Sequence, residues 1–233
     1  MGVHEQAVDV ARTRLDRARI LDAAETIADS EGVGRVTMRR IGAELGVDPT
    51  AIYRHFRNKE ELLIELADRL FGIEPPVDPE LPPREQLRAH MRYGLSRYRR
   101  HPDLAQLLAV QPDDTPNLQR IAESGISLLR QMGLPPAEAA AMFQVIENHV
   151  VGTGLYYALI EAAEDPRLGD PDAMRRAYAL LPETTHPAVV EAAGHMFPDL
   201  DASYDLGTEL ILDAVERLAE ALEAQSRTTG GGE

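Results

Sequence analysis

Apolar residues recur at steps of three and four along almost the whole chain. This spacing places them on one face of an α-helix, whereas a half-buried strand requires strict alternation of apolar and polar residues. Alternating runs rich in Val, Ile and Thr do not occur in the sequence. The sequence therefore predicts an all-α fold.

A cluster of prolines divides this helical pattern. Residues 72–83 contain five prolines, and each one blocks helix continuation and restricts the residue before it. We therefore expect an N-terminal domain over residues 1–72 and a second helical domain over residues 84–225. The glycine-rich segment 226–233 is expected to be a disordered tail.

The N-terminal domain has the capping residues of a helix-turn-helix. A first helix is predicted over residues 17–31, and Thr37 is a suitable N-cap for a second helix that ends near Glu44. Gly46 suits the tight turn, Asp48 can cap a third helix, and Pro49 fits the first position of that helix. The pattern predicts three short helices joined by a glycine turn.

The third helix, of roughly two turns, has one apolar face and one polar face. Ile52 and Phe56 lie four residues apart and can anchor it to the domain. The outer faces then carry Thr50, Ala51, Tyr53, Arg54 and His55. Asn58 can cap a fourth helix with Glu61 three residues later, and Lys59 in its first turn can reach a phosphate. A short helix with this surface has the dimensions to enter a DNA major groove.

The charge distribution is compatible with a nucleic-acid partner. The whole chain has 24 basic and 39 acidic residues, a net charge of −15. Residues 35–59 contain six basic residues against two acidic ones, a local charge of +4, whereas residues 73–233 contain 13 basic and 26 acidic residues. An acidic body with one basic patch remains consistent with DNA binding.

Composition also narrows the chemistry. The absence of cysteine excludes disulfides, thiolate metal sites and a cysteine nucleophile. Neither a signal-peptide pattern nor a membrane-spanning apolar run occurs, so we expect a cytoplasmic protein with no membrane association. Glu191 and His195 lie four residues apart, but no set of three or four metal ligands accompanies them. We expect no metal and no cofactor.

The second domain has two long helical segments, 136–163 and 204–224, that are apolar over a wide band. A band this wide can face both the helix's own core and a second subunit. Polar tips on otherwise apolar helices are expected in a small-molecule cavity, although buried His and Tyr residues are also common as satisfied core residues. The candidate ligand-binding residues are His90, Tyr93, Asn148, His149, Tyr156 and Tyr157.

Residues 20–71, and above all the run from Thr37 to Leu62, resemble the TetR family of bacterial regulators. The caps, the turn glycine, the aromatic spacing and the closing Asn-Lys-Glu-Glu-Leu all occur in the order of that family. The resemblance implies a helix-turn-helix followed by a variable helical ligand domain. It also implies a homodimer whose last two long helices form a four-helix interface.

The resemblance further implies which residues contact a double-stranded DNA operator. Tyr53 and Lys59 are interpreted as phosphate contacts, and Thr50, Ala51 and Arg54 as candidates for base edges. The arginines at positions 12, 14, 17 and 19 could form a basic arm on the DNA. The full set of implied contacts is Thr37, Arg39, Pro49, Thr50, Ala51, Tyr53, Arg54, His55 and Lys59.

The predicted function is that of a homodimeric repressor that releases a pseudo-palindromic operator when a small molecule binds. The two recognition helices would enter major grooves about 34–36 Å apart. A regulator that has no small-molecule ligand remains an alternative. A small helical enzyme is disfavoured, because the sequence shows no glycine-rich phosphate loop, no nucleophile with an ordered base and no paired metal carboxylates.

Overall fold

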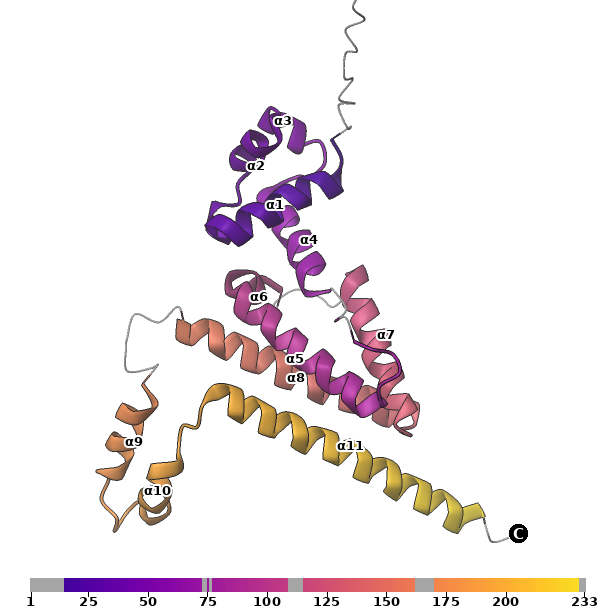
Figure 1. Ribbon diagram of the computed structural model, residues 1–233, viewed down its shortest axis with the longest axis vertical. Coiled ribbons are helices and arrows are strands. Elements are labelled where there is room, and N and C mark those ends of the chain that lie inside the picture. The colour runs from indigo at the N-terminus through magenta and orange to yellow at the C-terminus, as the bar shows by residue number, and fades with distance from the viewer. Residues whose placement is uncertain (1–14, 73–74, 76, 109–114, 162–169, 231–233) are drawn as a thin grey trace, which may run out of the picture. The chain divides into compact units, whose positions relative to one another are not determined.

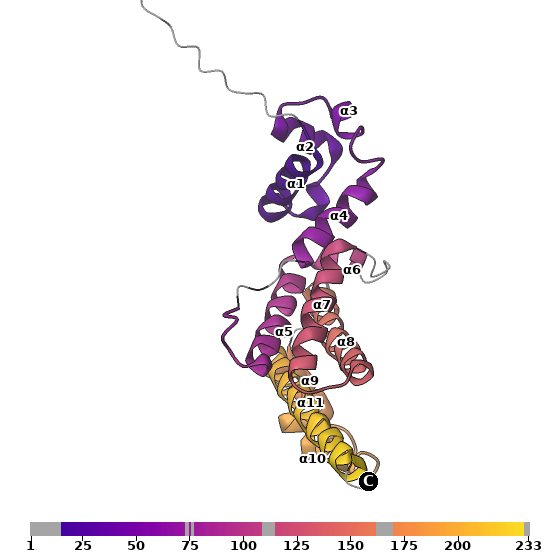
Figure 2. The ribbon, with the colours of Figure 1, turned by 90° about the vertical axis from the view of Figure 1, so that its right-hand side faces the viewer.

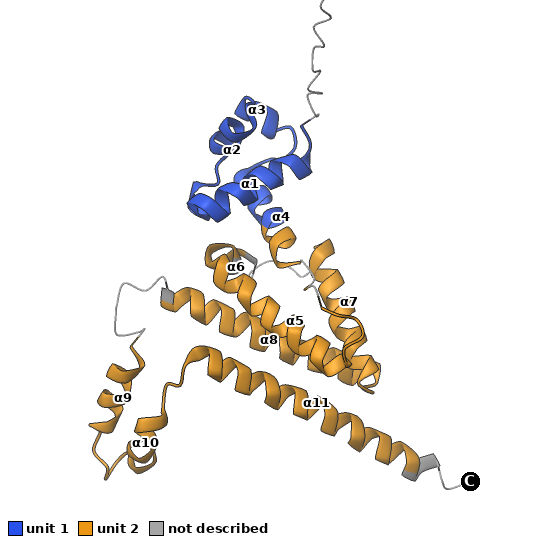
Figure 3. Cartoon of the chain, viewed as in Figure 1, with its two compact units in different colours: residues 1–66 blue, residues 67–233 orange. Residues whose placement is uncertain are grey.

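The computed structural model describes residues 15–72, 75, 77–108, 115–161 and 170–230, and these residues form helices without any strand (Figure 1). This confirms the predicted all-α class. The chain divides into two compact units, Met1–Leu66 and Ala67–Glu233 (Figure 3). The division falls inside a helix, α4 (Lys59–Phe71), and not in the proline-rich segment where the sequence placed the domain boundary.

Unit 1 contains the three helices of the predicted helix-turn-helix. They are α1 (Arg17–Glu31), α2 (Met38–Leu45) and α3 (Pro49–Ile52), with a short 3₁₀ helix, η1 (Val33–Arg35), between α1 and α2. α4 begins in this unit. Side chains from every one of these α-helices are buried in the unit, among them Ile20, Ala24, Ile27, Ile41, Ile52, Leu62 and Leu66, together with Phe56 from the segment between α3 and α4. The predicted apolar faces therefore form the core that holds the candidate reading segment, residues 49–56, which carries most of the candidate DNA contacts.

Most helices of unit 2 start at a proline. They are α5 (Pro83–Arg100), α6 (Pro102–Leu108), α7 (Pro116–Gln131), α8 (Pro136–Glu161), α9 (Pro171–Ala179), α10 (Pro187–Ala192) and α11 (Leu200–Gly230), with a 3₁₀ helix, η3 (Ala193–His195), before α11. Of these, α5 to α10 all begin with proline, which lacks the amide proton that the first turn of a helix leaves unpaired. The prolines that interrupt the helical pattern therefore start the next helix.

The core of unit 2 lies among α5, α7, α8 and α11. Figures 1 and 2 show α5, α7 and α8 side by side, with α11 along α5 and α8. Leu87, Met91, Leu129, Ile146 and Leu212 are buried members of one apolar cluster. α5, α7, α8 and α11 therefore share one hydrophobic core.

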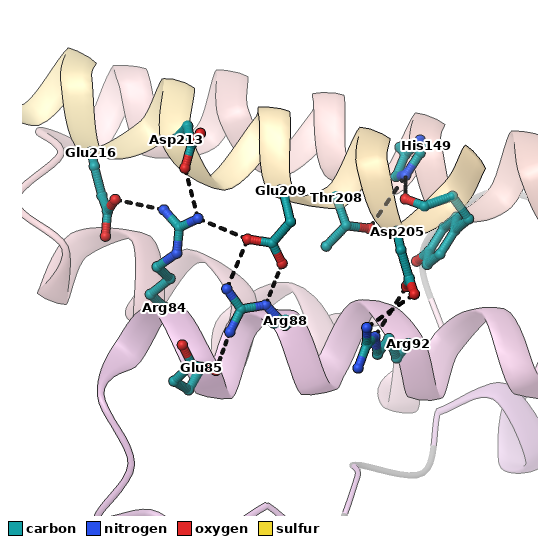
Figure 4. Close-up of polar contacts among 11 residues, drawn as sticks. Arg84, Glu85, Arg88, Arg92, His149, Asp205, Thr208, Glu209, Asp213 and Glu216 are labelled. Atoms are coloured by element: carbon teal, nitrogen blue, oxygen red, sulfur yellow. Dashed lines mark hydrogen bonds and ion pairs between the residues drawn. The ribbon is translucent and has the colours of Figure 1, made fainter. Parts of the chain in front are cut away.

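A ladder of ion pairs joins α5 to α11, as Figure 4 shows. Arg84, Arg88 and Arg92 recur every fourth residue on α5 and therefore lie on one helix face. Arg84 contacts Asp213 at 2.7 Å and Glu209 at 2.9 Å, Arg88 contacts Glu209 at 2.5 Å, and Arg92 contacts Asp205 at 3.0 Å. The residue numbers of the acidic partners fall from 213 to 205 along α11 while those of the arginines rise from 84 to 92 along α5. The two helices therefore run antiparallel.

The last helix is longer than predicted. α11 begins at Leu200 rather than near Tyr204, and it continues to Gly230. Residues 226–230 are therefore helical, whereas the sequence predicted a disordered tail, and residues 231–233 lie outside the described residues. The extension at the start has a local cause, because the Asp199 carboxylate accepts from the amide of Ala202 (3.2 Å) and caps the first turn.

Candidate DNA-binding surface and ligand cavity

The turn between α2 and α3 is set by two glycines. Gly46 has φ +66°, the left-handed conformation that a glycine adopts without steric cost. A Cβ at Gly42 would lie 2.9 Å from the carbonyl oxygen of Val47, whose own amide donates to the Gly42 carbonyl oxygen (2.9 Å). The two helices can approach this closely only because position 42 has no side chain.

Asp48 fixes the start of α3. Its carboxylate accepts from the amide of Thr50 (2.8 Å) and from the Thr50 hydroxyl (2.6 Å), and Pro49 occupies the first turn. The Thr50 hydroxyl, and after it the Thr50 amide, lower the pKa of Asp48. The Thr50 hydroxyl proton is therefore engaged locally, so Thr50 presents its methyl group and oxygen lone pairs to a partner.

The regular part of α3 is shorter than the predicted two turns. It ends at Ile52, and residues 53–55 form a turn in which the His55 and Phe56 amides both donate to the Ile52 carbonyl oxygen (2.9 and 3.0 Å). Ile52 and Phe56 are both fully buried. The two predicted anchors thus hold the segment by its apolar side, and Tyr53 and Arg54 are exposed on its other side.

None of the nine candidate DNA contacts is buried. The side chains of Thr37, Arg39, Thr50, Tyr53, Arg54 and Lys59 are exposed, and those of Pro49, Ala51 and His55 are partly exposed. Tyr53 is 54% exposed, a large fraction for an aromatic residue that the fold could have buried. The candidates are thus accessible to a partner on the surface of unit 1.

The candidate basic residues of unit 1 differ from Arg40 in whether they form ion pairs within the unit. Arg40 is paired with Glu31 (2.6 Å) and Glu44 (2.8 Å). Within the described part of the chain, Arg39, Arg54 and Lys59 have no acidic partner. A basic side chain without an internal partner remains available to a phosphate or a base edge.

Arg17 does not belong to the proposed basic arm. Its guanidinium pairs with Glu61 (3.2 Å) and with Glu65 on α4, donates to the carbonyl oxygen of His55, and lies 4.1 Å from the centre of the Phe56 ring. It therefore links α1 to α4 and to the end of the reading segment. Arg12 and Arg14 lie outside the described residues.

Unit 2 contains a cavity of about 180 Å³ among α5, α7 and α8. Its walls are mostly apolar, and Phe71, in the last turn of α4, contributes to them. The Phe71 ring packs edge-on against Tyr98, with 4.7 Å between ring centres. The described residues that line it are Phe71, Pro75, Leu87, His90, Met91, Tyr93, Gly94, Tyr98, Leu118, Gln119, Ile121, Ala122, Gly125, Phe143, Gln144, Ile146, Glu147 and Val150.

Two of the six candidate ligand residues, His90 and Tyr93, line this cavity. His149 instead stacks on Tyr204, with ring centres 4.5 Å apart, and Tyr157 donates to the Asp201 carboxylate (2.6 Å). Asn148 accepts from Gln144 (3.2 Å) at the surface, and half of the Tyr156 side chain is exposed. The α8 candidates therefore lie outside the cavity, because Ile146 and Val150 form the face of α8 that lines it.

Several lining residues were not singled out from the sequence. Phe71, Leu118 and Phe143 had only the signal of an apolar stripe, which does not distinguish a cavity wall from a packed core. Glu147 and Gln144 are polar residues on α8, and their spacing does not show which side of that helix faces α5 and α7. These residues could be assigned to the cavity lining only once the packing of α5, α7 and α8 was known.

Two further observations concern the described residues only. They contain no group of three or more histidine and acidic side chains placed to hold a metal ion. They also contain no helix both long and apolar enough to cross a membrane.

A helix-turn-helix with an exposed, basic reading segment, attached to a helical unit with an apolar cavity, defines a class of DNA-binding transcriptional regulators. Comparison with known proteins identifies the family within that class. The family described as bacterial regulatory proteins, tetR family, matches residues 20–66, and the tetracyclin repressor-like C-terminal domain matches residues 78–219. The chain belongs to the TetR family, as its sequence predicted.

Individual relatives agree with this assignment. The HTH-type transcriptional repressor DrrR1 of Streptomyces coeruleorubidus is 33% identical over 218 residues, which cover 89% of this chain and 80% of that protein. The class A tetracycline repressor from transposon 1721 in Escherichia coli is 25% identical over 213 residues, covering 88% and 92%. The crystal structure of ActR from Streptomyces coelicolor in complex with actinorhodin has a TM-score of 0.73 at 27% identity and covers 87% and 96%.

Proposed function

We propose that this regulator is a homodimeric repressor that leaves a pseudo-palindromic operator when a small molecule enters the cavity of unit 2. The observation that carries the proposal is the position of Phe71. This residue lines the cavity and belongs to α4, the helix whose first turns lie in the DNA-reading unit. A ligand that moves Phe71 acts on the helix that carries Lys59.

The end of α4 is firmly held in unit 2, which the proposal requires. The Leu70 carbonyl oxygen accepts from Arg97 of α5 (2.7 Å), and the Gly72 carbonyl oxygen accepts from Arg120 of α7 (3.2 Å). Each arginine is adjacent in sequence to a residue that lines the cavity, Arg97 to Tyr98 and Arg120 to Gln119 and Ile121. Helix movements around a bound ligand would therefore reach α4 through hydrogen bonds already formed, which gives the two sites a coupling free energy.

Residues 84–225 are proposed as the domain that senses the ligand and forms the dimer. Large apolar side chains on α8 and α11 are exposed in the single chain: Val145, Tyr156, Leu159, Leu206 and Leu210. A second subunit would cover them. The likeness to ActR, whose structure was solved in complex with actinorhodin, supports a small-molecule effector, and we propose that the protein acts in the cytoplasm by binding rather than by catalysis.

The experiment is selection of genomic fragments by the purified full-length protein, followed by fluorescence anisotropy on the fragment recovered. We expect an inverted repeat whose half-sites are about 34–36 Å apart. Lys59→Ala should weaken binding to all sequences alike and reduce the slope of log affinity against log salt by about one, because one phosphate contact is lost. Arg54→Ala should instead reduce discrimination between operator and random DNA.

Arg176→Ala supplies the matched control, because Arg176 is an exposed arginine in unit 2, with 69% of its side chain accessible. This variant should bind as the wild type does. Normal operator binding by both the Tyr53→Ala and Lys59→Ala variants would refute the proposed reading surface. Operator affinity that stays constant while a compound occupies the cavity would refute the sensing role.

A further inference from the structure

Arg17, the first residue of α1, contacts the reading segment and α4 at the same time. Its Nη1 donates to the carbonyl oxygen of His55, and its guanidinium carbon lies over the Phe56 ring, 4.1 Å from the ring centre. On the α4 side, Nη2 donates to Glu61 (3.2 Å) and Nε donates to Glu65 (3.1 Å). All of these residues belong to unit 1. One guanidinium thus joins the carboxyl end of the reading segment to the first two turns of α4.

The reading segment depends on such contacts because its own helix is too short to be stable. α3 has four residues, and a helix of this length does not persist by itself in water. Asp48 fixes the start of the segment, and the buried side chains of Ile52 and Phe56 fix its apolar side. The last carbonyl groups of a helix have no partner within it, and an arginine can satisfy them from outside. Arg17 supplies this third point of attachment at the carboxyl end.

The charge of Arg17 is engaged within the unit. The carboxylates of Glu61 and Glu65 share it, so the guanidinium would have to leave both of them to reach a phosphate. The Arg17 side chain is 42% exposed, and ion pairs in such partly exposed positions contribute little to the stability of a fold. The contacts of Arg17 therefore act mainly on the geometry of the reading segment.

We infer that Arg17 is a positioning residue for DNA recognition, which holds the reading segment in a fixed orientation to α4 and does not itself contact DNA. Tyr53 and Arg54 directly precede His55, so the carbonyl group that Arg17 holds belongs to the turn that presents them. Discrimination between base sequences depends on where such side chains lie, whereas binding to any DNA depends on phosphate contacts. This inference rests on the proposed function, because it concerns the same reading surface.

The main test is the double variant Arg17→Met/Glu65→Gln, which removes one charge of each sign and leaves the net charge of unit 1 unchanged. Fluorescence anisotropy measures its affinity for the operator recovered by genomic selection and for a random duplex of equal length. We expect the ratio of the two affinities to fall about tenfold, the scale of one lost hydrogen bond to a charged group. The slope of log affinity against log salt should keep its wild-type value, whereas loss of a phosphate contact would reduce it by about one.

Hydrogen exchange followed by mass spectrometry tests the same contact without DNA. The amides of His55 and Phe56 both donate to the Ile52 carbonyl oxygen, so the wild type should protect them. In the double variant, residues 53–57 should exchange faster while α1 and α2 keep their wild-type protection. A general loss of stability would instead accelerate exchange throughout unit 1.

Two further variants complete the design. Arg17→Lys keeps the charge and can still pair with α4, but an ammonium lacks the planar fork of a guanidinium. It should keep a melting temperature near that of the wild type and still lose discrimination, so the test stays decisive if the double variant does not fold. Arg227→Met/Glu223→Gln is the matched control, because the same substitutions remove an exposed ion pair of α11 in unit 2. It should bind and discriminate as the wild type does.

Three results would overturn the inference. The first is wild-type discrimination in either folded variant of Arg17. The second is a salt slope reduced by about one with an equal loss of affinity for both duplexes, which would make Arg17 a phosphate contact. The third is faster exchange throughout unit 1. The proposed function fails separately, if the wild-type protein does not distinguish the operator from the random duplex; hydrogen exchange then still tests the contact between Arg17 and the reading segment.

Discussion

The side-chain amide of Asn117 on α7 donates to the Asp68 carboxylate on the last turn of α4 across 2.8 Å. Asp68 is only 6% exposed, and its second carboxylate oxygen is buried without a hydrogen-bond partner in the described structure. A buried carboxylate with a single partner depends strongly on that partner. The contact therefore ties α4 to the cavity helix α7, in the unit that is proposed to sense the ligand.

Asn117→Ala should lower the free energy of unfolding by about 1–3 kcal/mol, because it leaves the Asp68 carboxylate buried and unpaired. Urea denaturation monitored by circular dichroism measures this. Gln131→Ala, at an exposed amide on the same helix, should change stability by less than about 0.5 kcal/mol. The double variant Asp68→Ala/Asn117→Ala should be no less stable than Asn117→Ala alone. Equal stability of the Asn117 and Gln131 variants would contradict the role given to Asp68.

Gly42→Ala should destabilise unit 1 by about 1–3 kcal/mol, the range for overpacking, because the added Cβ would meet the backbone oxygen of Val47 at 2.9 Å. A backbone oxygen cannot move aside as the end of a flexible side chain can. Gly34→Ala is the matched control, since nothing lies within 4 Å of a Cβ at that position. The melting temperature and the operator affinity should both decrease in Gly42→Ala. Both should remain near the wild-type values in Gly34→Ala. A wild-type melting temperature for Gly42→Ala would rule out the close α2–α3 approach.

The ladder between α5 and α11 predicts an acid-dependent loss of stability. Arg88, and after it Arg84, lower the pKa of Glu209 to about 2 from its ordinary 4.5. Because the folded-state pKa is the lower one, ionised Glu209 stabilises the fold above about pH 4.5, and this contribution is lost as the pH falls toward 2. The side chain is 42% exposed, so screening limits the effect to about 1 kcal/mol or less.

Glu209→Gln should therefore be less stable than the wild type near neutral pH, and the difference should narrow as the solution is acidified. Urea denaturation at several pH values measures it. Glu220→Gln, at an exposed carboxylate on the same helix, should show no such trend. A difference between wild type and Glu209→Gln that stays constant from neutral to acidic pH would contradict the proposed pairing.

Leu206→Glu together with Leu210→Glu should convert the protein to a monomer, because both leucines, 62% and 55% exposed on α11, lie on the surface proposed for the dimer. A charge buried without a partner in that interface is costly. Sedimentation velocity at micromolar concentration measures the mass. Leu180→Glu, at a leucine 85% exposed just after α9, should leave the dimer intact. A dimer that survives the double substitution would place the interface elsewhere.

The sequence by itself determined the helical class, the caps and turn of the helix-turn-helix, and the two anchors of its reading segment. These depend on local chemistry. A proline or an aspartate at a helix start, a glycine at a tight turn, and apolar residues four positions apart act within a few residues of themselves, so their effect can be predicted without knowing the rest of the fold. The same applies to the exposed positions of Tyr53 and Lys59.

The tertiary structure alone decided which side chains meet across helices. It placed Arg17 against Glu61 and Glu65 rather than in a basic arm, and it turned His149 toward Tyr204 and away from the cavity. An apolar stripe has the same periodicity whether it covers a core, a cavity or a second subunit. The direction of α8 relative to α5 and α7 selects among these, and residues far apart in the sequence determine that direction together.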